Sequence, residues 1–586
     1  MILQALAEYY DRKANDSVDP LAPPGFERKP IPFIIELTDS GEFLQVEDAR
    51  SQVGAKKIAK SFLVPQSMNR QGTKAYESPN TLWDHYGFVL GYAKRAGRDK
   101  EPLEKDVITA RLQHEHFINA VERIFSATQE SQVEAVLKFL VRKDYSKLFA
   151  TTQWEECSGI NGCNLTFRIQ GNRNLVCQAP SVIRFVQDRV SNEEIGGGAN
   201  AICLVSGELG AIERLHPGIS GVGKKPTPLA AVNDGVSPSF SSFGKHQGFN
   251  FPVGKEAAFK YTTALNHLLE RNGKQRMQIG DASTVFWAEK PTDLESGIVN
   301  CFGESPKDNP DQRVQAIEQL LKSVNNGRYT PDDGPTRFYV LGLAPNSGRI
   351  SVRFWHVGTV GEMAERIVQH FDDLKIVHGP DEQEFLPLKR LLKSIAVQHD
   401  EKNIPPNLAG NVMRSILEGR HFPETLLSGA LRRNRAEQKV TYPRAAIIKA
   451  FLNRYYKKEV IKVSLDNEYS NEGYLLGRLF AVLEQVQKEA LGRGINATIR
   501  DRYYGAASST PVAVFSTLLK LSKHHLAKVE NKGRVHNLEK LIGSILNGLP
   551  AKGFSPHLTL QDQGRFAIGY YHQKQHPSTY KGDNNE

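Results

Sequence analysis

Residues 337–357 read RFYVLGLAPNSGRISVRFWHV, two runs of β-branched and aromatic residues on either side of Asn-Ser-Gly. Runs of this composition, bounded by turn-forming residues, predict β-strands. Similar runs occur upstream and read NLTFRI (164–169), AICLVSG (201–207) and STVFWAEK (283–290). The chain from about residue 150 to residue 360 is therefore predicted to be mixed α/β.

Beyond about residue 400 the strand signals end and a helical period replaces them. Apolar residues recur three and four positions apart at 474–486, 514–519 and 538–546, with Gly or Pro in the connections. Amphipathic stripes joined in this way predict an antiparallel helical bundle. The predicted fold class is α+β, with a large mixed α/β region at 1–400, which includes a basic segment at 51–100, followed by a basic helical bundle at 401–586.

Three shorter patterns fill in the first region. Residues 1–15 and 101–145 have helical spacing, and residues 33–48 alternate around Asp39-Ser40-Gly41, which predicts a β-hairpin. Residues 200–260 are rich in Gly, Pro and Ser between short apolar runs. Long loops in compact domains tend to carry function, so this stretch is a candidate for binding.

The composition is that of an ordinary globular protein. The chain has 586 residues, of which 40% are hydrophobic and 24% charged, and its length predicts two to four domains. No apolar run approaches the ~18 to 20 residues of a membrane span, and the N-terminus has no signal-peptide pattern, so we expect a cytoplasmic protein without a membrane partner. Five cysteines, an odd number, favour buried free thiols over a metal site at Cys157, Cys163 and Cys177.

Positive charge is concentrated in two blocks. Residues 401–586 hold 28 Lys and Arg against 16 Asp and Glu, a net charge of +12, although the whole chain carries only +10. Residues 51–100 hold nine basic and three acidic side chains. Such blocks favour a polyanionic partner over an uneven solubility surface, because neutralised phosphates release condensed counterions.

Catalytic motifs are missing from the sequence. It contains no H-E-x-x-H, G-x-S-x-G, Walker or zinc-deaminase pattern. His114-x-His116 is predicted to lie on a solvated helix face, His524-His525 on a basic surface, and Asp372-Asp373 at a cap or in solvent. We therefore expect no enzyme activity, no cofactor and no metal.

The first basic block contains the most concentrated candidate site. Arg, Lys, Asn and Gln are the side chains that read base edges, and Asn69, Arg70, Gln71 and Lys74 follow one another in a segment interrupted by Pro and Gly. Lys56, Lys57 and Lys60, just upstream, are suited to phosphates. The alternative is an ordinary Lys-bearing helix face followed by a polar loop.

Eight collinear segments resemble the large subunit of the type I-C CRISPR surveillance complex, Cascade. They are LQALAEYYDR, APPGFERKPIPFIIEL, PNTLWDHYGFVLG, CLVSGELGAIERLHPGISGV, FSSFGKHQGFNFPVGKEAAFKYTTALNHLL, FYVLGLAPNSGRISVRFW, TYPRAAIIKAFLNR and DQGRFAIGYYHQKQ. Together they extend from residue 3 to residue 575. Two positions depart from the family pattern: Asp84-His85-Tyr86 stands where an Asn-containing element is expected, and Ser220 stands where a basic residue is usual.

This resemblance implies a non-catalytic role on nucleic acid. Such subunits recognise a short protospacer-adjacent motif in double-stranded DNA, help to unwind the duplex, stabilise the R-loop and its displaced strand, and dock the Cas helicase-nuclease. The guide RNA (crRNA), not the protein, reads the long target. The implied partners are the guide crRNA, target DNA, the helicase-nuclease, and the backbone, handle-capping and small subunits of Cascade, the last of which the C-terminal bundle resembles.

The resemblance also implies roles for the two blocks of positive charge. Asn69, Arg70, Gln71 and Lys74 are expected on the motif. Lys56, Lys57 and Lys60 are expected on the DNA backbone, and Lys245 and His246 are candidates for the same path or for docking a partner. The displaced strand is expected on the bundle, where single-stranded binding tolerates any sequence; the residues are Arg500, Arg502, Lys520, Lys523 and Lys528.

Two other classes of function remain open. A metal-dependent nuclease would share the basic surface, but it needs clustered carboxylates, and no such cluster follows a predicted strand beside a basic block. Divalent-metal dependence of DNA cleavage would distinguish it. A purely structural scaffold would show no preference for any flanking motif.

Overall fold

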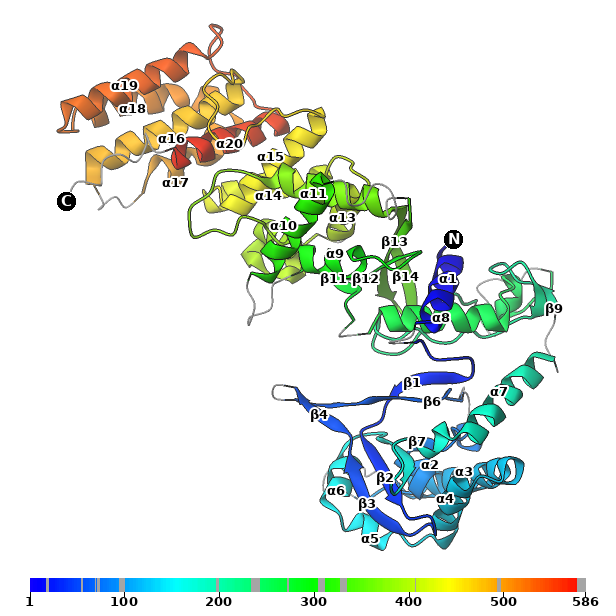
Figure 1. Ribbon diagram of the computed structural model, residues 1–586. Helices are drawn as coiled ribbons and strands as arrows, with labels where there is room; N and C mark the ends of the chain where they lie inside the picture. Colours follow the sequence, from blue (N-terminus) through cyan, green and yellow to red (C-terminus); the bar gives the residue numbers. More distant parts are fainter. Residues whose placement is uncertain are drawn as a thin grey trace. The chain divides into compact units, whose positions relative to one another are not determined.

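The computed structural model describes residues 1–16, 20–53, 56–68, 70, 74–93, 101–195, 200–232, 243–270, 273–303, 311–326, 335–405, 407–492 and 497–576 (Figure 1). The chain forms two compact units. The first consists of Leu3–Pro217 and Ala230–Leu265, and the second of Gly218–Leu229 and Asn266–Glu586. Several small sheets and many helices confirm the α+β fold class. The predicted division at residue 400 stays a prediction.

The first unit is built on a four-stranded sheet of order β3-β2-β8-β7. Its strands are β2 (Phe33–Leu37), β3 (Phe43–Asp48), β7 (Trp83–His85) and β8 (Asn164–Ile169). The predicted hairpin is confirmed as β2 and β3, which pair antiparallel. β2 pairs parallel with β8, and a parallel pair requires a crossover connection.

Helices occur within that crossover and after it. They are α2 (Tyr86–Leu90), α3 (Glu104–Thr128), α4 (Ser131–Arg142), α5 (Ser146–Phe149), α6 (Thr152–Gly159) and α7 (Pro180–Ile195). The predicted helical pattern at 101–145 is thus confirmed. Phe117, Val136 and Phe167 are fully buried in one core that joins α3, α4 and β8.

Two-stranded ribbons and a helix pair complete the first unit. β1 (Phe26–Pro30) pairs with β6 (Ser61–Pro65), β4 (Arg50–Val53) with β5 (Lys56–Ala59), and β9 (Asn200–Ile202) with β10 (Leu209–Ala211). α1 (Ile2–Ala14), predicted from its spacing, contacts α8 (Lys255–Leu268) through the rings of Tyr10 and Phe259, whose centroids are 5.6 Å apart. Asp11 and Lys260 form an ion pair of 3.0 Å beside them.

The second unit begins with an antiparallel meander of order β11-β12-β13-β14. The strands are β11 (Arg276–Ile279), β12 (Ala282–Ala288), β13 (Arg337–Asn346) and β14 (Arg349–Thr359), the last two as predicted. Ser347 and Gly348 connect β13 to β14 with φ of 44° and 81°. Two positive φ values indicate the turn type that matches the twist of paired strands. The helices α9 (Leu294–Phe302), α10 (Gln312–Asn325) and α11 (Val360–Leu374) pack on this sheet.

The rest of the second unit is helical, which confirms the predicted bundle. The helices are α12 (Leu388–Ile395), α13 (Leu408–Leu417), α14 (Glu424–Glu437), α15 (Tyr442–Tyr456), α16 (Glu472–Leu491), α17 (Ile499–Ser509), α18 (Phe515–Leu526), α19 (Lys532–Asn547) and α20 (Leu560–Gln575). The three predicted stripes are α16, α18 and α19. One continuous apolar core extends from β11 to α20. Among the described residues, no helix is long and apolar enough to span a bilayer.

Some polar side chains lie where the sequence did not predict them. His114 is buried, not solvated, and hydrogen-bonds the Phe88 carbonyl at 2.9 Å and the Tyr145 hydroxyl at 2.9 Å. Asp372 is 50% exposed, as predicted, whereas Asp373 is mostly buried and accepts a hydrogen bond from Arg454 Nε at 2.5 Å. All five cysteines are buried and free, as expected.

Candidate nucleic-acid interface

The basic segment 51–100 begins with an antiparallel ribbon, β4 and β5, that directly follows β3 (Figure 1). Gln52 lies opposite Lys57 in its register. Ser51, Gln52, Lys57 and Ile58 are all exposed, so both faces of the ribbon meet solvent. The helical alternative is wrong for this stretch. Because a two-stranded ribbon buries little apolar surface, it needs an anchor elsewhere in the unit.

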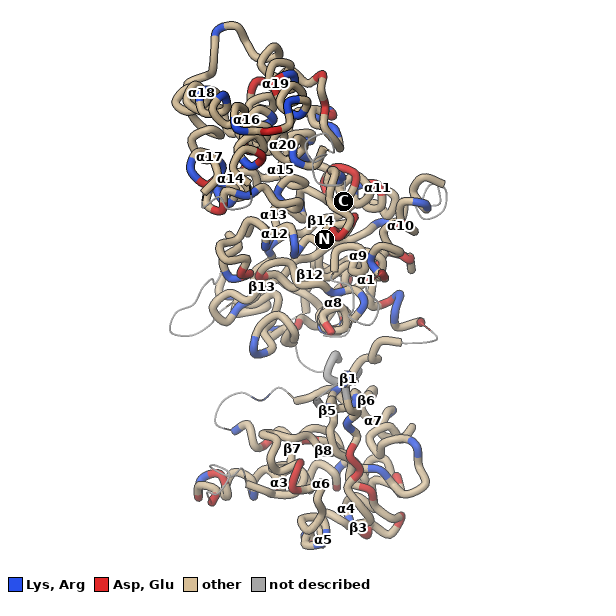
Figure 2. The backbone as a smooth tube through the Cα atoms, turned by 90° about the vertical axis from the view of Figure 1, so that its left-hand side faces the viewer, with Lys and Arg blue, Asp and Glu red and all other residues tan. Residues whose placement is uncertain are grey.

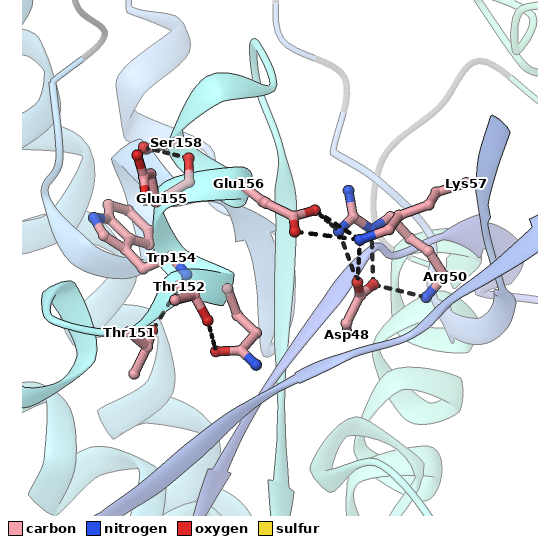
Figure 3. Close-up of polar contacts among 10 residues, drawn as sticks. Asp48, Arg50, Lys57, Thr151, Thr152, Trp154, Glu155, Glu156 and Ser158 are labelled. Carbon is pink, nitrogen blue, oxygen red and sulfur yellow. Dashed lines mark hydrogen bonds and ion pairs between the residues drawn. The ribbon is translucent and has the colours of Figure 1, made fainter. Parts of the chain in front are cut away.

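That anchor is a cluster of two cations and two carboxylates (Figure 3). Arg50 Nε lies 2.7 Å from Asp48 Oδ1, and the same guanidinium pairs with Glu156 of α6. Lys57 Nζ lies 3.0 Å from Glu156 Oε2 and 3.4 Å from Asp48 Oδ2. The Arg50 guanidinium also lies 4.4 Å from the ring centroid of Phe33. The ribbon is therefore fixed to both α6 and the sheet.

The charges of this cluster compensate one another. Hydrogen bonds from Arg50 lower the pKa of Asp48 to about 2, and Arg50 and Lys57 together lower the pKa of Glu156. The Glu156 carboxylate in turn raises the pKa of Lys57. With two positive and two negative groups in contact, Lys57 is an anchor of the ribbon and adds no uncompensated charge for a phosphate.

Arg70 is held from three sides. Its Nε donates to the Ser78 carbonyl at 2.8 Å, and both terminal nitrogens donate to the Asp84 carboxylate. The guanidinium lies 4.1 Å from the ring centroid of Phe88. Its side chain is 23% exposed and that of Asp84 is 1% exposed. Because the fork of the guanidinium is occupied by a carboxylate, this geometry favours positioning of the loop over bidentate reading of a base.

Asp84 organises the loop around Arg70. Its carboxylate also accepts hydrogen bonds from the backbone N–H groups of Asn80 at 2.9 Å and His85 at 2.8 Å. The Asn80 side chain accepts from the Met68 N–H at 2.9 Å. These bonds tie the ends of the segment that carries the predicted motif-reading residues to the sheet strand β7.

The other residues predicted for this site lie as follows. Asn69 and Gln71 fall outside the described residues, as does the side chain of Lys56, whose backbone belongs to β5. Lys74 is 76% exposed, with Nζ 3.6 Å from the Glu77 carboxylate. Lys60 is exposed, and its ammonium lies 5.3 Å from the ring centroid of Phe62. Among the predicted cations whose side chains the structure describes, Lys60 and Lys74 are therefore the ones that solvent reaches most freely.

The loop that holds Lys245 and His246 presents an exposed aromatic residue beside them. Phe243 is 97% exposed and has a φ of 53°, and Lys245 and His246 are exposed as well. The loop then enters a short 3₁₀ helix, Gln247–Asn250, and the Asn250 amide donates to the Lys245 carbonyl at 3.2 Å. An exposed aromatic ring beside a lysine is a combination that binds unstacked bases. The quoted FSSFGKHQGF stretch contained this signal, but no role was predicted for Phe243.

The helical bundle carries the second block of charge, and Figure 2 marks its basic residues in blue. Lys520 and Lys523 of α18 and Arg502 of α17 are exposed, as is Lys528 just after α18. None of the four forms an ion pair with the described part of the chain. These four positions therefore offer uncompensated charge. His524, between Lys523 and Lys528, is also exposed, as predicted.

Arg500 differs from the other predicted residues of the bundle. Its side chain is 29% exposed, with Nη2 3.2 Å from Asp501 and Nη1 3.9 Å from Glu484 of α16. Burial of the Glu484 carboxylate was not predicted from the sequence, because a charged residue of a helix normally faces solvent. Only the packing of α16 against α20 buries it.

Comparisons with known proteins give a family. Residues 6–577 match the family described as CRISPR-associated protein (Cas_Csd1). The chain belongs to this family. The match confirms the resemblance found in the eight sequence segments and identifies a Cascade-type CRISPR-associated protein, whose partners are other Cas proteins and nucleic acids. No curated protein matches the chain.

Membership of this family gives a context for the two basic surfaces of the Csd1-family chain. Within the described ranges, no three His, Cys, Asp or Glu side chains gather as a metal site would require. The anchored ribbon, the loop residues tied to Asp84 and the exposed cations of the bundle contain residues predicted to bind nucleic acid, and this role stays a prediction. Each lies on an element whose own packing fixes it in place.

Proposed function

We propose that this chain is the non-catalytic large subunit of a type I-C Cascade. In this role it recognises the protospacer-adjacent motif in double-stranded DNA, helps to separate the strands, stabilises the R-loop and displaced strand, and offers a docking surface to the Cas helicase-nuclease. Its partners are the guide crRNA and the backbone, handle-capping and small subunits. Membership of the family and the two blocks of positive charge support the proposal.

The observation that carries the motif-recognition role is the β4–β5 ribbon. The major groove of B-DNA admits a two-stranded ribbon, and here both faces of the ribbon are exposed while its base is fixed by Arg50 and Glu156. Lys60 follows the ribbon directly. Asp84, which accepts the Asn80 N–H, lies on β7 of the four-stranded sheet that also contains β3. A preformed ribbon with a neighbouring cation can enter the groove without paying for its own ordering.

The bundle supports the displaced-strand role. Lys520 and Lys523 are exposed on one helix and lack carboxylate partners in the described ranges, so a backbone of phosphates would gain their full attraction. Such contacts tolerate any sequence and depend strongly on salt. Lys520→Glu with Lys523→Glu is therefore expected to shorten R-loop lifetime in the reconstituted complex while motif preference stays unchanged. An unchanged lifetime would contradict this part of the proposal.

The main test is binding of the reconstituted complex to target duplexes with a randomised flanking motif. The full chain is assembled with guide RNA and the other Cascade subunits, and the bound motifs are sequenced. Combined alanine substitutions at Asn69, Arg70 and Lys74 are expected to erase the preference. Lys60→Ala is expected to weaken binding to all motifs equally, with a salt slope smaller by about 0.9 for one lost phosphate contact.

The control is Lys147→Ala, which removes an exposed cation of α5 in the same unit. It should leave both the preference and the salt slope unchanged. Wild-type complexes that bind all flanking sequences alike would indicate a scaffold and overturn the proposal. Cleavage of DNA by the purified chain in Mg²⁺ or Mn²⁺, abolished by a chelator, would indicate a nuclease instead.

A further inference from the structure

Three cations of the bundle converge on one buried carboxylate. Glu484 of α16 is 1% exposed, and Lys488 Nζ lies 2.9 Å from its Oε1. Arg500 Nη1, from α17, lies 3.9 Å from Oε1, and Lys574 Nζ, from α20, lies 3.7 Å from Oε2. Lys488, Arg500 and Lys574, the bundle cation cluster, thus come from three different helices and meet at one point.

The carboxylate is itself fixed from the side of α20. The Tyr570 hydroxyl donates to Glu484 Oε2 at 2.6 Å, and the Lys574 ammonium lies 3.3 Å from the same hydroxyl. Oε1, by contrast, accepts no hydrogen bond among the described residues, although it is buried. Lys574 also donates to the Tyr570 hydroxyl, and Arg500 donates to Asp501. An ammonium and a guanidinium carry more N–H groups than these contacts use, so donors remain for a further acceptor.

The cluster has more positive than negative charge. Asp501 faces Arg500 at 3.2 Å, but its carboxylate also accepts the Thr498 N–H at 2.8 Å as the cap of α17. Glu489, next to Lys488 in α16, pairs with Arg534 at 2.7 Å and is not shared. Three positive side chains thus face the Glu484 carboxylate and the Asp501 carboxylate, which is shared with the cap of α17. The net charge of the cluster is therefore positive.

The cations also repel one another. Burial is the main cause that lowers the pKa of Lys574, Glu484 opposes the shift, and the charges of Lys488 and Arg500 lower the pKa further. A structural ion pair would need one cation for one carboxylate. Holding three cations against Glu484 and a shared Asp501 costs energy unless another anion approaches.

An outside anion can reach the cluster. The side chain of Lys488 is 40% exposed, that of Arg500 29% and that of Lys574 26%, whereas Glu484 lies beneath them. Solvent therefore meets donor groups first and the carboxylate hardly at all. Each cation is half-buried, so attraction to a phosphate there is screened less than at a fully exposed lysine.

We propose that Lys488, Arg500 and Lys574 form a phosphate-binding site for a nucleic-acid backbone, with Glu484 as the positioning residue beneath it. The site rests on the proposed function, because it adds a built contact to the bundle surface on which Lys520 and Lys523 are expected to bind the displaced strand. It differs from those lysines in being preorganised. An ammonium already held in place loses less side-chain entropy when it binds.

The test uses the full chain and two kinds of probe. Pyrophosphate, added during thermal unfolding, reports occupation of the site by a small anion. Fluorescein-labelled oligothymidylate and oligouridylate of equal length report binding of DNA and RNA backbones by anisotropy. The variant is Lys488→Gln with Lys574→Gln, and the matched control is Lys540→Gln with Lys552→Gln, which removes two exposed lysines from the same bundle.

The expected result is a loss in the variant that the control lacks. At 0.1 M salt each lost contact to a single strand lowers affinity about fivefold, and the salt slope falls by about 0.7 per contact. The pyrophosphate-induced rise in the unfolding temperature should disappear as well. Equal losses of DNA and RNA binding indicate a backbone contact, and a larger loss for one of them identifies the strand that the site holds.

Glu484→Gln separates this site from a structural ion cluster. Glutamine keeps the size of the side chain and an acceptor for the Tyr570 hydroxyl, but it removes the negative charge that opposes an incoming anion. The variant should therefore bind pyrophosphate more tightly than the wild type, even if its unfolding temperature without ligand is lower. The inference is overturned if Lys488→Gln with Lys574→Gln behaves like the control for both probes. If that happens while Lys520→Glu with Lys523→Glu still abolishes strand binding, the proposed function stands and only this site fails.

Discussion

Arg70 donates two hydrogen bonds to the carboxylate of Asp84, a residue fourteen positions later that is 1% exposed. The pair links position 70, in the predicted motif-reading segment, to the element where the family pattern departs at Asp84-His85-Tyr86. Arg70, whose guanidinium could read a base, is therefore engaged by a carboxylate of the same chain.

We expect Arg70→Ala to lower the free energy of unfolding by about 3 kcal/mol, because it leaves a buried carboxylate without its counter-charge. Arg70→Lys should recover only part of the loss, since an ammonium cannot form the two parallel bonds. Urea unfolding measures both values. Lys74→Ala, at an exposed position nearby, should change the value by less than about 0.5 kcal/mol. A fully stable Arg70→Ala variant with lost motif preference would instead make Arg70 a direct reader.

α16 and α20 cross so closely that two glycines are required at the contact. A Cβ on Gly477 would overlap the carbonyl oxygen of Phe566, and one on Gly569 would overlap that of Tyr474. We expect Gly477→Ala to destabilise the second unit by about 3 kcal/mol, because backbone cannot move aside as a side chain can. Gly543→Ala in α19 is the control: a Cβ there meets nothing within 4 Å, so it should stabilise the helix by up to ~1 kcal/mol. Similar unfolding midpoints for the two variants would contradict the close crossing.

The sequence predicted the strands and helices better than the contacts between them. Strand composition at 337–357 and the apolar spacing of α16, α18 and α19 are local signals, and each predicted element formed. The pairing of Arg50 with Glu156, 106 positions apart, is set by the packing of β4 against α6 and has no local signal. Lys57 shows the consequence: its charge was predicted for DNA, whereas in the fold it belongs to a compensated cluster.

Burial of single polar residues was the least predictable property. His114 and Glu484 each occupy one position of a helix, and their polar residue type, not their spacing, suggested that they face solvent. The hydroxyl of Tyr145, just before α5, bonds His114, and the hydroxyl of Tyr570, from α20, bonds Glu484, so each buried polar group has a partner. Such partners become visible only when the helices are packed.

His572 makes the second unit sensitive to acid. Burial, and then repulsion by Lys449, lower its pKa to about 4, and its Nδ1 lies 3.0 Å from the Tyr474 hydroxyl. The unfolded chain binds a proton at this residue near pH 6.5, whereas the folded chain does so only near pH 4. The contribution of His572 to the free energy of unfolding is therefore fully present above pH 6.5. It decreases, by about 3 kcal/mol in total, as the pH drops toward 4.

His572→Gln should remove that part of the pH dependence, since glutamine keeps a polar group near Tyr474 but does not titrate. Urea midpoints at pH 7.5 and pH 4.5 give the measurement. His557→Gln, at an exposed position of the same unit, should leave the difference between the two midpoints as it is in the wild type. The explanation fails if His572→Gln and His557→Gln show the same difference.

Phe243 is expected to act in strand separation. Its ring is 97% exposed, beside the exposed side chains of Lys245 and His246, and an aromatic ring kept in water is costly unless a partner covers it. Stacking of one base on such a ring contributes ~1 to 3 kcal/mol, so Phe243→Ala should slow opening of the duplex next to the motif about tenfold. Fluorescence of 2-aminopurine at the first target position, in the reconstituted complex, reports the opening.

Phe243→Trp should retain the opening rate. Leu209→Ala, which removes another exposed apolar side chain from the same unit, should leave the rate unchanged. Equal opening rates in Phe243→Ala and the wild type would exclude this role and leave the ring as a contact for a protein partner.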